Sequence, residues 1–69
     1  MSARPDFVCE GRTRKGATER REIRTGPLRE RKAAALSAAR DMVKLGCTRV
    51  TVYAWNPALK RYVVVATVT

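Results

Sequence analysis

The clearest hydrophobic pattern lies in the middle of the chain, where apolar residues recur at helical spacing. They are Leu28, Ala35, Leu36, Ala39, Met42 and Val43. Thr25-Gly26-Pro27 precedes this run, and proline is favoured at the first helical position because its missing N–H is not needed there. Gly46 suits the end of a helix, since glycine readily adopts a positive φ. The pattern predicts a helix over residues 27–46.

After Gly46 the hydrophobic period changes to two, which is typical of strands. Residues 49–55 alternate cleanly and are rich in β-branched and aromatic side chains. Asn-Pro at 56–57 favours a turn over residues 56–60, and residues 61–69 predict a second strand. Strict alternation would place one set of side chains on the same side of that strand: Tyr62, Val64, Ala66 and Val68. We therefore expect a C-terminal β-hairpin within residues 47–69.

The N-terminal third has a weaker pattern. Residues 6–10 favour a short strand, and residues 18–25 favour a polar strand whose only sizeable apolar residue is Ile23. A flexible basic turn, residues 11–16, separates them. We expect a basic β-hairpin within residues 1–26, and a disordered basic arm is the alternative.

Together these elements predict one small α+β domain over residues 1–69, with the order β-β-α-β-β. A single helix can cover only one face of the antiparallel sheet. Both sides of the strand at 61–69 are mostly apolar, and such strands are normally buried on both faces. We therefore expect a homodimer, in which a second copy covers the remaining apolar surface or pairs with the terminal strand as an edge.

The composition is strongly basic, with a net charge of +9 and a sequence pI near 10.9. The chain has no histidine, which excludes Ser-His-Asp and Cys-His catalysis and every zinc site that needs imidazole. Arginine outnumbers lysine by 11 to 4, and there are ten alanines, which favours a bacterium with a GC-rich genome or its phage as the source. The same codon bias is an alternative explanation for the charge.

Other features exclude membrane and metal classes. No run approaches the roughly 18 apolar residues that a membrane span requires. The N-terminus lacks the apolar core of an export signal, so we expect a cytoplasmic location. Cys9 and Cys47 are expected to be reduced, buried thiols, and two thiols alone cannot complete a tetrahedral metal site.

Nothing in the sequence favours an enzyme. The acidic residues have basic or exposed neighbours, so no desolvated pocket is indicated that would tune a carboxylate. Ser2 and Ser37 have no base to activate them. Gly11 and Gly16 have the spacing of half a phosphate-binding loop, but Ala17 stands where that loop needs lysine. We expect no catalysis, no cofactor and no small-molecule substrate.

Basic residues gather in the predicted N-terminal hairpin. They are Arg12, Arg14, Lys15, Arg20, Arg21 and Arg24, and Arg40 and Lys44 on the helix can extend the patch. Against Glu19 and Glu22, the segment keeps a local net charge of +4. A two-stranded ribbon of this kind can reach phosphates and fits the major groove of DNA. Binding of that kind weakens steeply as salt rises.

Three aromatic residues form the second group of candidates. If the turn holds four or six residues, then Tyr53, Trp55 and Tyr62 lie on the same face of the C-terminal hairpin. Exposed, they would make a stacking platform for unpaired bases, framed by Arg49 and Arg61. Buried, they would form the dimer interface or the contact with the helix.

These observations favour a small nucleic-acid-binding protein that contacts the phosphates of DNA or RNA through its basic hairpin. The alternative is a protein–protein interaction module, for example a phage accessory protein that engages a host protein. Such a module would use its apolar sheet face or its terminal strand edge.

Overall fold

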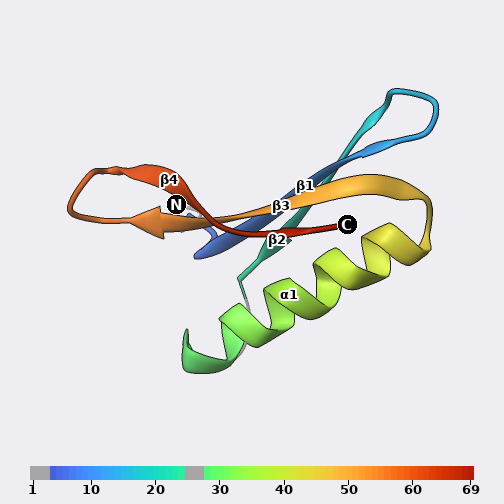
Figure 1. Cartoon of the computed structure of the whole chain (residues 1–69). Coiled ribbons are helices and arrows are strands. Elements are labelled where there is room, and N and C mark those ends of the chain that lie inside the picture. Colours follow the sequence, from blue (N-terminus) through green and yellow to red (C-terminus); the bar gives the residue numbers. More distant parts are fainter. Residues whose placement is uncertain (1–3, 25–27) are drawn as a thin grey trace.

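The computed structural model describes residues 4–24 and 28–69 and shows the expected order of elements. These are β1 (Phe7–Thr13), β2 (Thr18–Ile23), α1 (Leu28–Lys44), β3 (Cys47–Asn56) and β4 (Arg61–Val68). The strands pair antiparallel in the order β2-β1-β3-β4, and α1 lies across one face of the sheet (Figure 1). A small α+β domain with one helix on an antiparallel sheet is therefore confirmed.

The core lies between α1 and the two central strands. From α1, the side chains of Ala35, Ala39 and Met42 are buried. From the sheet, the buried partners are Cys9, Cys47, Val50 and Val52. The small alanine side chains allow the helix to lie close to the sheet, and burial of the Met42 side chain contributes about 1.5–3 kcal/mol. We call the sheet surface that contacts α1 the helix face, and the opposite surface the open face.

The N-terminal segment forms the predicted hairpin. β1 and β2 pair from Phe7 with Ile23 to Arg12 with Thr18, so the alternative of a disordered arm is wrong for these residues. β1 continues to Thr13, beyond the strand predicted at 6–10, because it lies between β2 and β3 and pairs with both. The two hairpins project in opposite directions from the centre of the sheet (Figure 1).

The helix ends slightly earlier than the sequence predicts. α1 stops at Lys44, and Leu45 and Gly46 form a turn before β3. Gly46 has a φ of +116°, which confirms the expected role of glycine at this end. The predicted start at residues 25–27 lies outside the described residues.

β4 corrects the expected alternation. Tyr53 pairs with Val64 but Val52 pairs with Ala66, so one extra residue, Val65, interrupts the register. Such a β-bulge reverses the side to which later residues point. Ala66 therefore follows Val52 onto the helix face, as does Val68, whereas Tyr62 and Val64 lie on the open face.

Both cysteines are buried and free, as the sequence predicts. The Cys9 thiol donates a hydrogen bond to the carbonyl oxygen of Ala35, with 3.2 Å between Sγ and O. Burial raises the pKa of the Cys9 thiol, and the charge of Arg21 on β2 lowers it in part.

Candidate functional site

The basic residues of the β1–β2 hairpin are all exposed, but they do not lie on one face. Side chains alternate between the two faces of a strand. Cys9 and Ile23 pack into the core, so Arg12 and Arg20, each three residues away on the same strand, lie on the open face. Arg21 alternates with Arg20, pairs with Cys9 and lies on the helix side. Arg14 and Lys15 form the turn between the strands, and Arg24 follows β2.

Ion pairs divide these cations into two groups. Glu22 pairs with both Arg20 and Arg24, at nitrogen–oxygen distances of 3.5 Å and 3.0 Å. Arg12, Arg14 and Lys15 form no ion pair within the described part of the chain. These three cations lie together at the projecting end of the hairpin.

Arg40 and Lys44 do not share a surface with Arg12 and Arg20. Both are exposed on α1, whose other side packs Ala39 and Met42 onto the helix face. Arg12 and Arg20 lie on the open face, beyond the sheet. The structure thus brings Arg12, Arg14, Lys15 and Arg20 onto one hairpin and leaves Arg40 and Lys44 on the outer surface of the helix.

The three aromatic residues share the open face, as predicted for a turn of four residues. Trp55 pairs with Tyr62 across β3 and β4, with ring centroids 5.2 Å apart at 67°. The expectation that these rings contact the helix is wrong, because Val52 and Ala54 occupy that side of β3. Of the two arginines expected to frame the platform, Arg49 lies on the open face. Arg61 precedes Tyr62 and lies on the other face.

The N-terminal residues pack against two of these rings. The Arg4 guanidinium carbon lies 4.2 Å from the centre of the Trp55 ring. The Tyr62 hydroxyl donates a hydrogen bond to the carbonyl oxygen of Pro5 at 2.8 Å, and Asp6 forms an ion pair with Arg31 on α1. No local pattern in the sequence relates Arg4 to a ring 51 residues away, so its contact with Trp55 could not be predicted.

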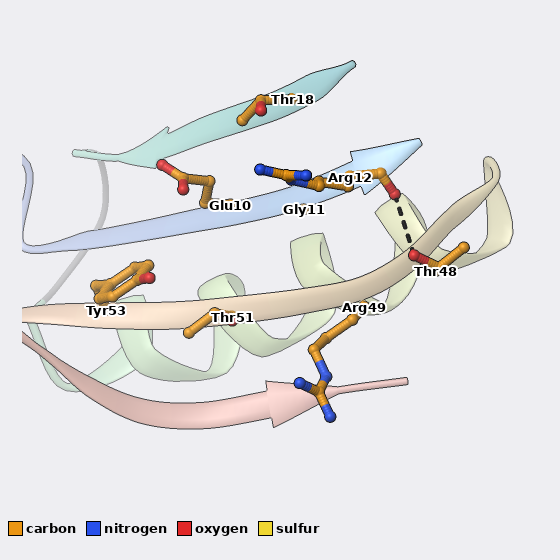
Figure 2. Close-up of a pocket in the computed structure, with 8 residues that line it drawn as sticks. All are labelled: Glu10, Gly11, Arg12, Thr18, Thr48, Arg49, Thr51 and Tyr53. Atoms are coloured by element: carbon orange, nitrogen blue, oxygen red, sulfur yellow. Dashed lines mark hydrogen bonds between the residues drawn. The ribbon is translucent and has the colours of Figure 1, made fainter. Parts of the chain in front are cut away.

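Two adjoining hollows mark the open face. One, of about 390 Å³, is lined by residues of β1, β2 and β3: Glu10, Gly11, Arg12, Thr18, Thr48, Arg49, Thr51 and Tyr53. The other, of about 240 Å³, is lined by Val8, Glu10, Arg20, Tyr53 and Tyr62. In Figure 2, Tyr53 and Thr48 stand at opposite ends of the first hollow, and Arg12 lies along β1 toward Glu10. Glu10 and Tyr53 border both hollows.

The described residues contain no group of three or more His, Cys, Asp or Glu side chains that could hold a metal ion. Within the same residues, α1 is neither long nor apolar enough to cross a lipid bilayer. Comparisons with protein-family models, with curated protein sequences and with solved structures found no match to this chain.

Proposed function

We propose that this chain binds nucleic acid through phosphate contacts made by the β1–β2 hairpin. The observation that carries the proposal is the set of exposed cations without a carboxylate partner at the projecting end: Arg12, Arg14 and Lys15. A guanidinium can donate two parallel hydrogen bonds to one phosphate, and a lysine adds a compact positive charge. A side chain that is already exposed and unpaired has no intramolecular ion pair to lose when it meets a phosphate.

Fluorescence anisotropy with labelled DNA and RNA at increasing salt tests this proposal. The double variant Arg14→Gln/Lys15→Gln removes two charges from the hairpin turn. Each lost phosphate contact should reduce the slope of log affinity against log salt by about 0.7–0.9. Affinity should fall for all sequences alike, because phosphate contacts carry no base specificity.

Arg40→Gln/Lys44→Gln is the matched control, since it removes the same charge from the outer surface of α1. We expect it to lower affinity less than the hairpin variant does. Equal losses from the two variants would mean that overall charge, rather than the hairpin, attracts the nucleic acid. No binding at about 50 mM salt would refute the proposal as a whole.

A second candidate function is protein association through β4. This strand is an edge of the sheet, and its Val64 and Val65 side chains are 59% and 40% exposed. Strand addition at such an edge joins many protein pairs, and a second copy of this chain is the simplest partner. The bulge at Val65 limits the length of strand available for regular pairing.

Size-exclusion chromatography with light scattering tests this association. A dimer of the wild-type chain that Val64→Lys converts to monomer would support it. Thr67→Lys, on the same strand and also exposed, is the matched control for the added charge. A wild-type monomer across micromolar concentrations would contradict self-association.

A further inference from the structure

The open face has a polar half and an aromatic half. Toward the β1–β2 turn, Arg12 and Arg49 are direct partners on neighbouring strands, and Arg20 lies on the next strand. Toward the other end lie Tyr53, Trp55 and Tyr62. The two hollows meet at Glu10 and Tyr53, where the polar half gives way to the aromatic half.

Arg12 and Arg49 repel each other across the sheet. Like charges at directly opposed positions on adjacent strands are unfavourable, and neither arginine has an ion pair within the described residues. In Figure 2, Arg12 lies along β1 while Arg49 extends from β3 toward β4, so the two side chains point apart. A phosphate seated between the two guanidinium groups would turn this repulsion into two attractions.

Tyr53 differs from the other two aromatic side chains in the polar and ring contacts that it makes. Trp55 is covered by Arg4, and the hydroxyl of Tyr62 is bonded to Pro5. Tyr53 forms no side-chain hydrogen bond and no ring contact within the part of the chain that the structure describes. Its side chain is partly buried and borders both hollows, so a flat ligand can stack on the exposed part of the ring without displacing the N-terminal residues.

We infer that the open face binds single-stranded nucleic acid, with a base stacked on Tyr53 and a backbone phosphate between Arg12 and Arg49. This inference rests on the proposed nucleic-acid binding and narrows it to unpaired strands, because only an unpaired base can leave its neighbours and stack on a side chain. Glu10, between the two hollows, can accept a hydrogen bond from the amino group of such a base.

A second copy of the chain fits this face poorly. A two-fold interface would bring the open-face arginines of both copies, Arg12, Arg20 and Arg49, into one buried surface. The open face offers Glu10 and Glu22 as acids, and Glu22 is already paired with Arg20 and Arg24. Charge complementarity therefore favours a polyanion over self-association here.

The test compares one labelled oligonucleotide of about 12 nucleotides as a single strand and as a duplex, in DNA and in RNA. We expect the wild-type chain to bind the single strand more tightly. Tyr53→Ala should weaken single-strand binding by about 5- to 150-fold, the range for one stacked base, with little effect on the duplex. Tyr53→Phe keeps the ring and should bind as the wild type does.

A second pair of variants tests the phosphate site without touching the aromatic half. Arg12→Gln/Arg49→Gln should weaken single-strand binding more than Arg40→Gln/Lys44→Gln, which removes equal charge from α1. Thermal melting of every variant establishes that the fold is intact. Because all four of these basic side chains are exposed, their replacement should leave the fold unchanged.

The outcomes separate this inference from the proposed function. Equal affinity for duplex and single strand, or wild-type affinity of Tyr53→Ala, would overturn the single-strand site. If Arg14→Gln/Lys15→Gln still weakened binding in that case, the hairpin proposal would stand. No binding of either form at about 50 mM salt would overturn both.

Discussion

The Cys9 thiol lies in the core between β1 and α1, where its surroundings favour the neutral form. Burial raises its pKa, and the hydrogen bond to the Ala35 carbonyl requires the thiol proton. The positive charge of Arg21 opposes burial but does not outweigh it. At neutral pH we therefore expect a protonated thiol that packs as a small apolar side chain.

This raised pKa makes stability depend on alkaline pH. Above 9.0, the ordinary value for the thiol, the unfolded chain loses the Cys9 proton while the folded chain retains it. The unfolded state then binds fewer protons, so the free energy of unfolding falls as the pH rises through the folded-state value. Below the ordinary value, the contribution of Cys9 is fully present.

Urea unfolding of the wild type and of Cys9→Ala between neutral pH and pH 10 measures this effect. Cys9→Ala should be less stable at neutral pH because it leaves a cavity. The difference in unfolding free energy should narrow on the alkaline side, since only the wild type has this thiol to ionise. The remaining ionisable groups are common to both proteins. Parallel pH curves would contradict the assignment.

Local sequence pattern predicts on which face of a strand a residue lies, but not its contacts with distant segments. Alternation alone predicts that Arg49, Tyr53 and Trp55 share a side of β3, and the structure agrees. The contact of Arg4 with Trp55 depends on how the N-terminal residues lie against the finished sheet. No pattern in either segment encodes that contact.

At the scale of the strand, the packing of β3 against β1 leaves no room for a side chain at Gly11. A Cβ added there would lie 2.9 Å from the carbonyl oxygen of Arg49 and 2.9 Å from a Val50 methyl carbon. The carbonyl belongs to the backbone and cannot rotate away. We therefore expect Gly11→Ala to lower the free energy of unfolding by about 1–3 kcal/mol, the usual cost of overpacking.

Chemical denaturation can compare Gly11→Ala with Glu10→Ala. Glu10 is the next residue on the same strand, but its side chain is exposed on the open face. Its replacement should change stability by no more than about 0.5 kcal/mol. If Gly11→Ala were as stable as the wild type, the close approach of β1 to β3 would be wrong.

In the C-terminal hairpin, the sequence predicts the turn but not the bulge in β4. Asn-Pro and the alternating residues around it are sufficient to predict the hairpin and its turn. The Asn56 side chain supports that turn by accepting hydrogen bonds from the backbone N–H groups of Ala58 and Leu59. The bulge falls within three consecutive valines, residues 63–65. Because their side chains are identical, composition cannot show which one is the extra residue.

For the whole molecule, sequence proximity is a poor guide to which charges act together. The eight basic residues predicted as one patch divide between the hairpin and the outer surface of α1. Within β2, Arg20 and Arg21 point to opposite faces because strand neighbours alternate. The surface on which a charge lies therefore depends on whether its residue belongs to the helix or the sheet, and on which side of its strand it points. Neither can be read from the number of arginines along the chain.

The net charge of +9 predicts a salt effect on the stability of the whole fold. The molecule extends 34 Å at most, about the Debye length at 10 mM salt, so its excess of positive charges is little screened there and repulsion dominates. At about 150 mM that length falls to about 8 Å, and most of the repulsion is screened. Three ion pairs among the described residues lose attraction as well, but they are too few to offset the gain.

Added sodium chloride should therefore raise the melting temperature, by about 4–8 °C for each kcal/mol of repulsion removed. Thermal unfolding followed by circular dichroism measures the shift. Arg40→Gln/Lys44→Gln lowers the net charge to +7 on an exposed surface of α1, so its melting temperature should respond less to added salt. Equal salt responses of the two proteins would place the effect in local contacts. A melting temperature that falls with salt would mean that attraction outweighs repulsion in the folded chain.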